Sequence, residues 1–251
     1  MNSHDVWSLA VALTALVGIA AALGGWAGLG QSKAVLTASV RALIQLLAVG
    51  AVITAVLRTP ALAPVYLAVM VTAAAWTSGR RISRHRLAVP TAGLAIVIGA
   101  AASALTVFSC QALPFQVRTA VPLIAQLVGG SMTATTLSGQ RLVDDVNAHW
   151  DEVEAWLAIG ATPRQSVATL ARRAAARALV PALDQTRNVG LVVLPGAFVG
   201  LLLGGATPLA AGRLQLLVLV GLLAAETLAA ITVTRLLSGW IALTRPPEAA
   251  H

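Results

Sequence analysis

Long apolar stretches separated by short polar ones make up most of the chain. Seven of these stretches approach or exceed the roughly 20 residues that a helix needs to cross a hydrocarbon core about 30 Å thick. Apolar residues do not alternate strictly with polar ones, so the pattern does not suit a membrane-spanning barrel. The sequence predicts an all-α, polytopic integral membrane protein with about seven transmembrane helices, at residues 6–29, 35–57, 61–79, 88–110, 119–138, 189–206 and 212–237.

The sixth stretch and the two ends of the chain differ from the rest. The sixth stretch is the shortest, and its length leaves open whether it crosses the membrane completely. The first stretch resembles a signal peptide only in position, because no Lys or Arg precedes Lys33 and the apolar run is too long, so we expect a retained span. Residues 244–251, with Pro246 and Pro247, are predicted to be a disordered tail of a single membrane domain, 1–251.

Composition agrees with a lipid environment. The chain is 58% hydrophobic and 10% charged, with a mean hydropathy of +0.84, whereas soluble domains carry about 25% charged residues. The net charge of +8 comes from basic residues that stand between the apolar runs, so we expect the lipid bilayer and no nucleic acid as its partner. The single cysteine, Cys110, excludes an internal disulfide, and four scattered histidines do not form a metal-binding motif.

The basic residues also predict the orientation in the membrane, because cytoplasmic loops carry an excess of Lys and Arg. With the N-terminus outside and the C-terminus in the cytoplasm, only Arg58, Arg118 and Arg213 lie outside. Fourteen basic residues then lie inside: Lys33, Arg41, Arg80, Arg81, Arg84, Arg86, Arg141, Arg164, Arg172, Arg173, Arg177, Arg187, Arg235 and Arg245.

One long polar segment, residues 139–188, follows the fifth span and is predicted to be cytoplasmic. It begins with apolar residues at helical spacing, which are Leu142, Val146, Trp150, Val153 and Leu157. Five of the nine acidic residues of the chain lie beside them, namely Asp144, Asp145, Asp151, Glu152 and Glu154. A solvated helix face and a partner-binding surface both remain open for this acidic stretch.

A sharp turn interrupts this segment. Gly160 breaks the helix, and the residues from Thr162 to Gln165 form a capping-box pattern in which Pro163 occupies the first helical position. The second helix carries Arg172, Arg173 and Arg177 and runs toward Pro181. We therefore predict a cytoplasmic helix–turn–helix between the fifth and sixth spans.

The sequence excludes a nucleotide site on this chain. A Walker A loop ends in Gly-Lys-Ser/Thr, but the only lysine, Lys33, follows Ser32. Intramembrane proteolysis is also disfavoured, because no histidine or aspartate lies inside the predicted spans. We expect no catalytic residues and no cofactor on this chain, so any ATP and Mg²⁺ would be bound by a partner.

The turn carries a resemblance to a known motif. The run from Glu154 to Gly160, followed by Ala-Thr-Pro, resembles the Glu-Ala-Ala-x-x-x-Gly loop of ABC transporter permeases, although Trp156 replaces the second alanine and Pro181 lies beyond the usual spacing. In that family the loop forms a coupling helix seated on the ATPase. The resemblance implies that coupling to an ATPase would involve Glu154, Ala155, Gly160, Ala161, Thr162 and Pro163.

Further segments resemble the FetB family of bacterial iron-export permeases and related plant aluminium-tolerance half-transporters. They are Arg41–Leu46 with Val49-Gly50, Ile159–Pro163, Arg177–Pro181, Val189–Val192 and Leu194–Gly196, in order along nearly the whole chain. The resemblance implies a permease domain in the bacterial plasma membrane that forms a homodimer, pairs with a cytoplasmic ABC ATPase and exports iron or another metal. An importer permease and a non-transport sensor or scaffold remain as alternatives.

Polar residues within the spans are candidates for a solute pathway, because such residues are costly in lipid. Glu226 is the only acid at mid-span and either lines a cation path or pairs with an arginine; it departs from the small residue expected in the FetB pattern. Arg41 lies one turn from Gln45 and either faces the path or extends to the interface. Gln126 and Met132 add possible donors on the fifth span, and the metal ligands stay unknown.

The sixth predicted span contains small residues at a regular interval. Gly196, Gly200 and Gly204 leave one flat helix face, which follows Pro195 and allows another helix to approach closely. Packing within one subunit, a dimer interface and a moving gate are all compatible with this pattern.

Overall fold

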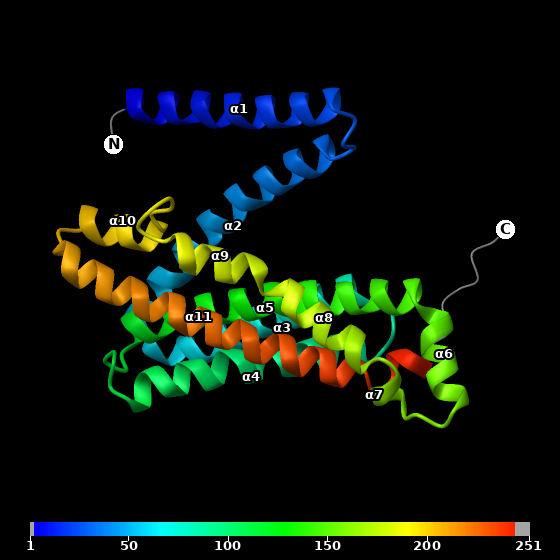
Figure 1. Ribbon diagram of the computed structural model, residues 1–251. Coiled ribbons are helices and arrows are strands. Elements are labelled where there is room, and N and C mark those ends of the chain that lie inside the picture. The colour runs from blue at the N-terminus through cyan, green and yellow to red at the C-terminus, as the bar shows by residue number, and fades with distance from the viewer. Residues whose placement is uncertain (1–2, 244–251) are drawn as a thin grey trace. The chain divides into compact units, whose positions relative to one another are not determined.

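The computed structural model describes residues 3–243 and divides the chain into two compact units, Met1–Pro60 and Ala61–His251 (Figure 1). Six helices of the described residues are long and apolar enough to cross a membrane. The predicted all-α, polytopic membrane architecture is therefore confirmed, with six full-length candidate spans. The prediction for residues 244–251 falls outside the described residues.

The first unit is a helical hairpin. Helix α1 (Ser3–Trp26) and helix α2 (Ser32–Arg58) correspond to the first two predicted spans. Gly28 and Gly30 adopt φ values of +67° and +65° in the connecting turn, and the Ser32 hydroxyl donates a hydrogen bond of 2.8 Å to the Ala21 carbonyl. These contacts fix the turn, while most side chains of both helices are exposed, as expected for surfaces that face lipid.

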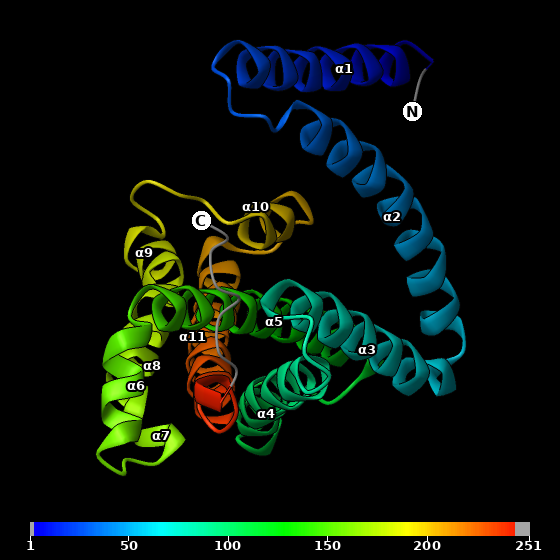
Figure 2. The same cartoon turned by 90° about the vertical axis from the view of Figure 1, so that its right-hand side faces the viewer.

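The second unit is built on four long helices, α3 (Ala63–Ile82), α4 (Ala88–Ser109), α5 (Val117–Ala148) and α11 (Pro208–Leu237), of which α4 and α5 each contact the other three. Figure 2 shows this bundle from one end. Small residues allow the close packing, as at Gly99, where an added Cβ would lie 2.4 Å from the Ala225 carbonyl oxygen. Ile96 and Leu127 are fully buried between the helices. These four helices correspond to the third, fourth, fifth and seventh predicted spans.

The sixth predicted span is not a full crossing. Within 189–206 only α10 (Gly196–Leu203) is helical, and eight residues of α-helix are about 12 Å long. Pro195 precedes its first turn, and Gly204 with Gly205 at φ +87° ends it, so the apolar run cannot continue as one helix. A turn closed by a bridge between Val189 and Val193 comes before it.

The segment predicted as 139–188 divides into several elements. Helix α5 continues to Ala148 and is followed by α6 (Trp150–Ala158), α7 (Pro163–Ser166), α8 (Ala168–Ala178) and α9 (Val180–Asn188). Helix α8 packs on α5 and α11, and α9 packs on α11. In Figure 1 these two helices lead from α7 back toward α10. Arg187, which is predicted to lie inside, is in the last turn of α9 and therefore lies away from α7. Two short 3₁₀ turns, Pro60–Leu62 and Ile241–Leu243, complete the fold.

The second unit thus has two different ends. We call the one formed by the α3–α4 turn, the last turns of α3, α5 and α11, and α6, α7 and α8 the arginine-rich end. We call the one formed by the α4–α5 turn, α10 and the first turns of α11 the open end. The open end carries Arg118 and Arg213, whereas the arginine-rich end carries Arg80, Arg81, Arg84, Arg86, Arg141, Arg164, Arg172, Arg173, Arg177 and Arg235.

Candidate functional site

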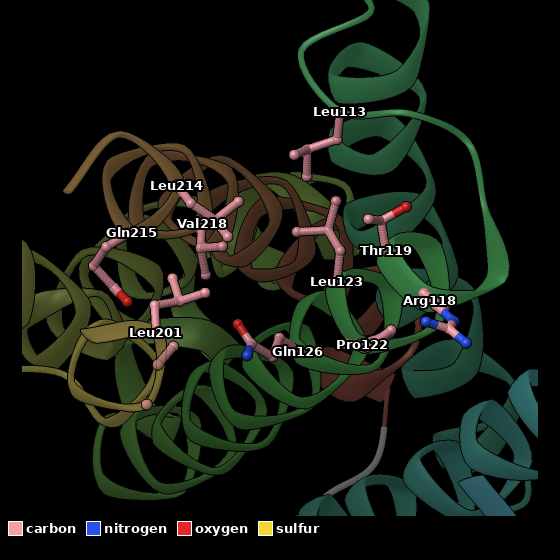
Figure 3. Close-up of a pocket in the computed structure, with 12 residues that line it drawn as sticks. Leu113, Arg118, Thr119, Pro122, Leu123, Gln126, Leu201, Leu214, Gln215 and Val218 are labelled. Carbon is pink, nitrogen blue, oxygen red and sulfur yellow. The ribbon is translucent and has the colours of Figure 1, made fainter. Parts of the chain in front are cut away.

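A hollow of about 350 Å³ lies at the open end between α5, α10 and α11 (Figure 3). The apolar start of α11 and the glycine-containing α10 form its walls, and the first turns of α5 contribute most of its polar groups. It is lined by Leu113, Arg118, Thr119, Pro122, Leu123, Gln126, Ala197, Gly200, Leu201, Leu214, Gln215 and Val218. Mostly apolar walls with a few polar groups are typical of small-molecule sites.

Two glutamines give this hollow its polarity. Gln215 is only 6% exposed, and its Oε1 atom has no hydrogen-bond partner in the described part of the chain. Gln126 is exposed on the facing helix, and Figure 3 shows both amides directed toward the space around Leu201. A buried, unpaired amide oxygen costs about 1–3 kcal/mol, so a solute with an N–H or O–H donor would relieve this cost.

A second polar contact lies along the same pair of helices. Gly130 is one turn beyond Gln126 on α5, and an added Cβ there would lie 2.7 Å from Oε1 of Glu226 on α11. The half-buried Glu226 side chain therefore occupies space that the glycine leaves free. We call Gln126, Gly130, Gln215 and Glu226 the polar seam, because they follow the contact between α5 and α11.

The other candidate pathway residues lie elsewhere. Met132 packs, partly buried, against an apolar cluster that includes Leu123 and Leu127, so its sulfur has a packing role. Arg41 and Gln45 are exposed on α2 in the separate first unit. Sequence reasoning missed Gln215; a single amide between Leu214 and Leu216 was the available signal.

The glycines of α10 do not make a close helix contact within the described residues. A Cβ added at Gly196 or Gly200 would meet no heavy atom within 4 Å, and Gly204 is the residue that ends the helix after Pro195 began it. A dimer interface and a moving gate therefore remain predictions for this face.

At the arginine-rich end, α6, the turn at Gly160, and α7 with α8 correspond to the predicted helix–turn–helix, and the predicted second helix is interrupted at Val167. We call its first part, α6 and α7 (residues 150–166), the coupling hairpin. Gly160 adopts φ +90°, a conformation that favours glycine. The predicted capping box is confirmed. Thr162 Oγ1 accepts a hydrogen bond from the backbone N–H of Gln165, and Gln165 Oε1 accepts one of 2.8 Å from the backbone N–H of Thr162. Fully buried Val153 anchors α6 to the bundle. The hairpin is thus a defined structure with a sharp turn.

The outer side of the coupling hairpin is hollowed. A groove of about 590 Å³ runs between α6 and the start of α8, and Glu154 and Ala155 lie on the exposed side of α6. Trp156 and Ile159 are 47% and 76% exposed, which is unusual for large apolar side chains at a helix end outside the apolar spans. The groove is lined by Glu152, Trp156, Ile159, Gly160, Ala161, Gln165, Ser166, Ala168, Thr169, Leu170 and Arg172.

Several contacts hold the hairpin and its surroundings to the bundle. Arg177 on α8 forms a salt bridge with Asp145 on α5. The rings of His85 and Trp240 stack with centroids 4.4 Å apart, and Gln140 donates a hydrogen bond to the Arg81 carbonyl. These contacts join α8 to α5, the α3–α4 turn to the residues after α11, and α5 to the end of α3. Within residues 3–243 no three His, Cys, Asp or Glu side chains come together as a metal site.

The fold and these sites define a multi-pass, all-helical membrane protein with a polar seam between two helices and a hairpin at its arginine-rich end. The chain belongs to the uncharacterised protein family UPF0014, whose model matches residues 6–240. The predicted resemblance is confirmed at the level of this family, which includes FetB and plant aluminium-related proteins.

Three relatives illustrate the family. The chain is 37% identical over 228 residues to UPF0014 membrane protein STAR2 of Oryza sativa subsp. japonica, covering 90% of this chain and 80% of the relative. It is 38% identical over 167 residues to Protein ALUMINUM SENSITIVE 3 of Arabidopsis thaliana, covering 66% and 61%. It is 31% identical over 235 residues to Probable iron export permease protein FetB of Escherichia coli (strain K12), covering 92% and 90%. No solved structure matches the chain.

Proposed function

We propose that this chain is the transmembrane permease subunit of an ABC transporter that exports iron or another metal from a bacterial cell, driven by a separate cytoplasmic ATPase. The observation that carries this proposal is the coupling hairpin at the arginine-rich end, in a chain that lacks a Walker A loop. The export direction and the metal rest on the name of the FetB relative.

The arginine-rich end faces the cytoplasm in this proposal, because cytoplasmic ends of membrane proteins collect Lys and Arg. The groove beside Trp156 and Ile159 then receives the ATPase, whose nucleotide-driven movement shifts α6. Helices α5 and α8 carry this shift toward the polar seam, since the Arg177–Asp145 contact joins them. Two copies of the chain enclose the pathway, with one ATPase on each.

The polar seam supplies the solute path. Glu226 attracts a cation at mid-span, while Gln126 and Gln215 offer amide oxygens at the open end. Carboxylate and amide oxygens are ligands that suit hard cations. The Glu226→Gln variant should therefore weaken the stimulation of ATPase activity by the transported metal while leaving ATPase binding unchanged.

A matched pair of glycine variants tests the coupling. An added Cβ meets no heavy atom within 4 Å at either Gly160 or Gly129, but only Gly160 has a positive φ. Gly160→Ala strains the turn by about 1–2 kcal/mol, so it should reduce ATPase binding and ATP-dependent metal flux about five- to thirtyfold. Gly129→Ala should leave both unchanged. Equal behaviour of the two variants, or ATP-driven transport by the chain without any ATPase, would disprove the proposal.

Orientation has its own test. In a Cys110→Ser background, a cysteine introduced at Ala161 should be shielded from a membrane-impermeant thiol reagent in intact cells and should react after the cells are opened. Labelling of position 161 in intact cells would place the hairpin outside, where no cytoplasmic ATPase reaches it.

A further inference from the structure

A second and larger hollow, of about 780 Å³, lies at the arginine-rich end where α7, α8 and α11 meet. Its charged groups are three guanidinium side chains, one from each of these helices: Arg164, Arg172 and Arg235. All three are exposed, and none forms a salt bridge within the described residues. No acidic residue lines the hollow. A concentration of unpaired positive charge of this kind calls for an anionic occupant.

The arginines converge on one place although they are far apart in sequence. Arg164 reaches across to the end of α11, where its Nε and Nη2 atoms lie 3.8 and 3.9 Å from the position of a Cβ added at Gly239. Arg172 and Arg235 extend into the same space from α8 and from the last turn of α11. The two hydroxyl groups of the lining already form hydrogen bonds, since Thr234 and Ser238 donate to backbone carbonyls of α11. The guanidinium donors therefore remain available for a ligand.

The surface next to the hollow is apolar and belongs to a membrane-spanning helix. One face of α11 is exposed along its length and ends at Arg235; it carries Leu216, Val220, Ala224, Leu228 and Ile231. Ile231 lines the hollow one turn before Arg235, together with small residues of α8. A positively charged mouth at the end of an apolar stripe matches a molecule with an anionic head and a hydrocarbon chain.

We propose that this hollow binds the phosphate headgroup of an anionic phospholipid, whose acyl chain lies along the exposed stripe of α11. Basic hollows between transmembrane helices bind anionic headgroups in this way. The arginines would fork to the phosphate oxygens, for which guanidinium geometry is suited. Such a lipid would tie α7 and α8 to α11 and so link the membrane surface to the coupling hairpin. This site is separate from the polar seam and does not require the transport proposal to hold.

Native mass spectrometry of the purified chain in detergent tests the lipid site directly. The probe is dioleoylphosphatidylglycerol, with dioleoylphosphatidylcholine as the zwitterionic comparison. The Arg164→Gln, Arg172→Gln, Arg235→Gln triple variant should bind the anionic lipid about a hundredfold more weakly, at about fivefold for each arginine. The corresponding triple lysine variant keeps the charge but loses the guanidinium fork, so it should bind the anionic lipid more tightly than the triple glutamine variant, which separates lost charge from misfolding.

A charge-matched control uses arginines that do not line the hollow. Arg84→Gln, Arg173→Gln and Arg213→Gln together remove the same charge and should leave lipid binding within about twofold of the unmodified chain, since surface charges at a distance are screened. An equal loss in this control, or equal binding of the two lipids by the unmodified chain, would overturn the proposal. Displacement of the lipid by millimolar inorganic phosphate would assign the hollow to a free anion. Loss of ATPase binding with unchanged lipid binding in the triple glutamine variant would assign it to protein docking.

Discussion

The two ends of the Ala61–His251 unit are built differently, although the same helices form both. At the arginine-rich end a salt bridge and a stacked ring pair join elements distant in sequence, and a capping box begins α7. At the open end a short helix lies between two glycine-containing turns, beside a hollow with an unpaired buried amide. In the proposed transport cycle, a shift applied at the arginine-rich end would pass through these contacts, while the hollow at the open end leaves space for a pathway to change shape.

Two glycine substitutions, one at each end, should show the largest difference in stability between the two ends. At Gly79 an added Cβ would lie 2.5 Å from Cα and 2.7 Å from N of Val89, both backbone atoms that cannot move without separating α3 from α4. We expect Gly79→Ala to destabilise the protein by about 2–3 kcal/mol, because overpacking outweighs the helix propensity of alanine. Thermal unfolding in detergent, followed by circular dichroism, measures this.

Gly200→Ala at the open end is the matched control. Its added Cβ meets no heavy atom within 4 Å, and the residue lies inside α10, so alanine should be neutral or stabilising by up to about 1 kcal/mol. If both variants lost the same stability, the two ends would not differ in packing, and the comparison above would fail.

Substitution of the buried amide of Gln215, at the open end, should have the next largest effect on stability. Gln215→Leu removes the unpaired Oε1 atom at nearly constant volume, so we expect the protein to gain about 1–2 kcal/mol of stability. The same change should lower metal-stimulated ATPase activity of the reconstituted complex about tenfold, because one amide-oxygen contact to the metal is lost. Gln126→Leu, at an exposed position, should leave stability nearly unchanged. A destabilised Gln215→Leu variant would mean that this amide already has a partner.

Much of the fold follows from apolar length alone, because lipid forces each long apolar run into a helix. The stretch at 189–206 shows the limit: its composition is apolar enough, but Pro195 and Gly205 confine helix to eight residues. The sequence could not reveal that α8 and α9 pack back along the bundle, since their basic residues favour a cytoplasmic location.

The candidate site also has features that local sequence predicts and features that depend on packing between distant helices. Local geometry was predictable, because the capping box of Thr162 and Gln165 depends on residues three positions apart. The polar seam was not, because Gly130 meets Glu226 only through the packing of two helices distant in sequence. Gln215 was missed for the same reason: its burial depends on α10 and α5, not on its neighbours in the chain.

The capping box allows a smaller test of the arginine-rich end. Thr162→Ala removes the hydroxyl that accepts a hydrogen bond from the backbone N–H of Gln165, so we expect the coupling hairpin to lose about 1 kcal/mol of local stability. Hydrogen exchange of the backbone amides of residues 164–166 should become about fivefold faster. Thr162→Ser keeps the hydroxyl and should exchange at the original rate. Unchanged exchange in the alanine variant would show that the hairpin does not depend on this cap.

The salt bridge at the same end should have the smallest effect. The Arg177 side chain is 54% exposed and that of Asp145 is 17% exposed, so water and salt screen the pair and its coupling free energy should be about 0.5–1 kcal/mol. A double-mutant cycle with Arg177→Met and Asp145→Asn measures this term, which should fall as the salt concentration rises. Arg173→Met is the control, since Arg173 forms no salt bridge within residues 3–243. A coupling free energy of zero at low salt would leave the packing of α8 on α5, rather than charge, as the link that moves the two helices together.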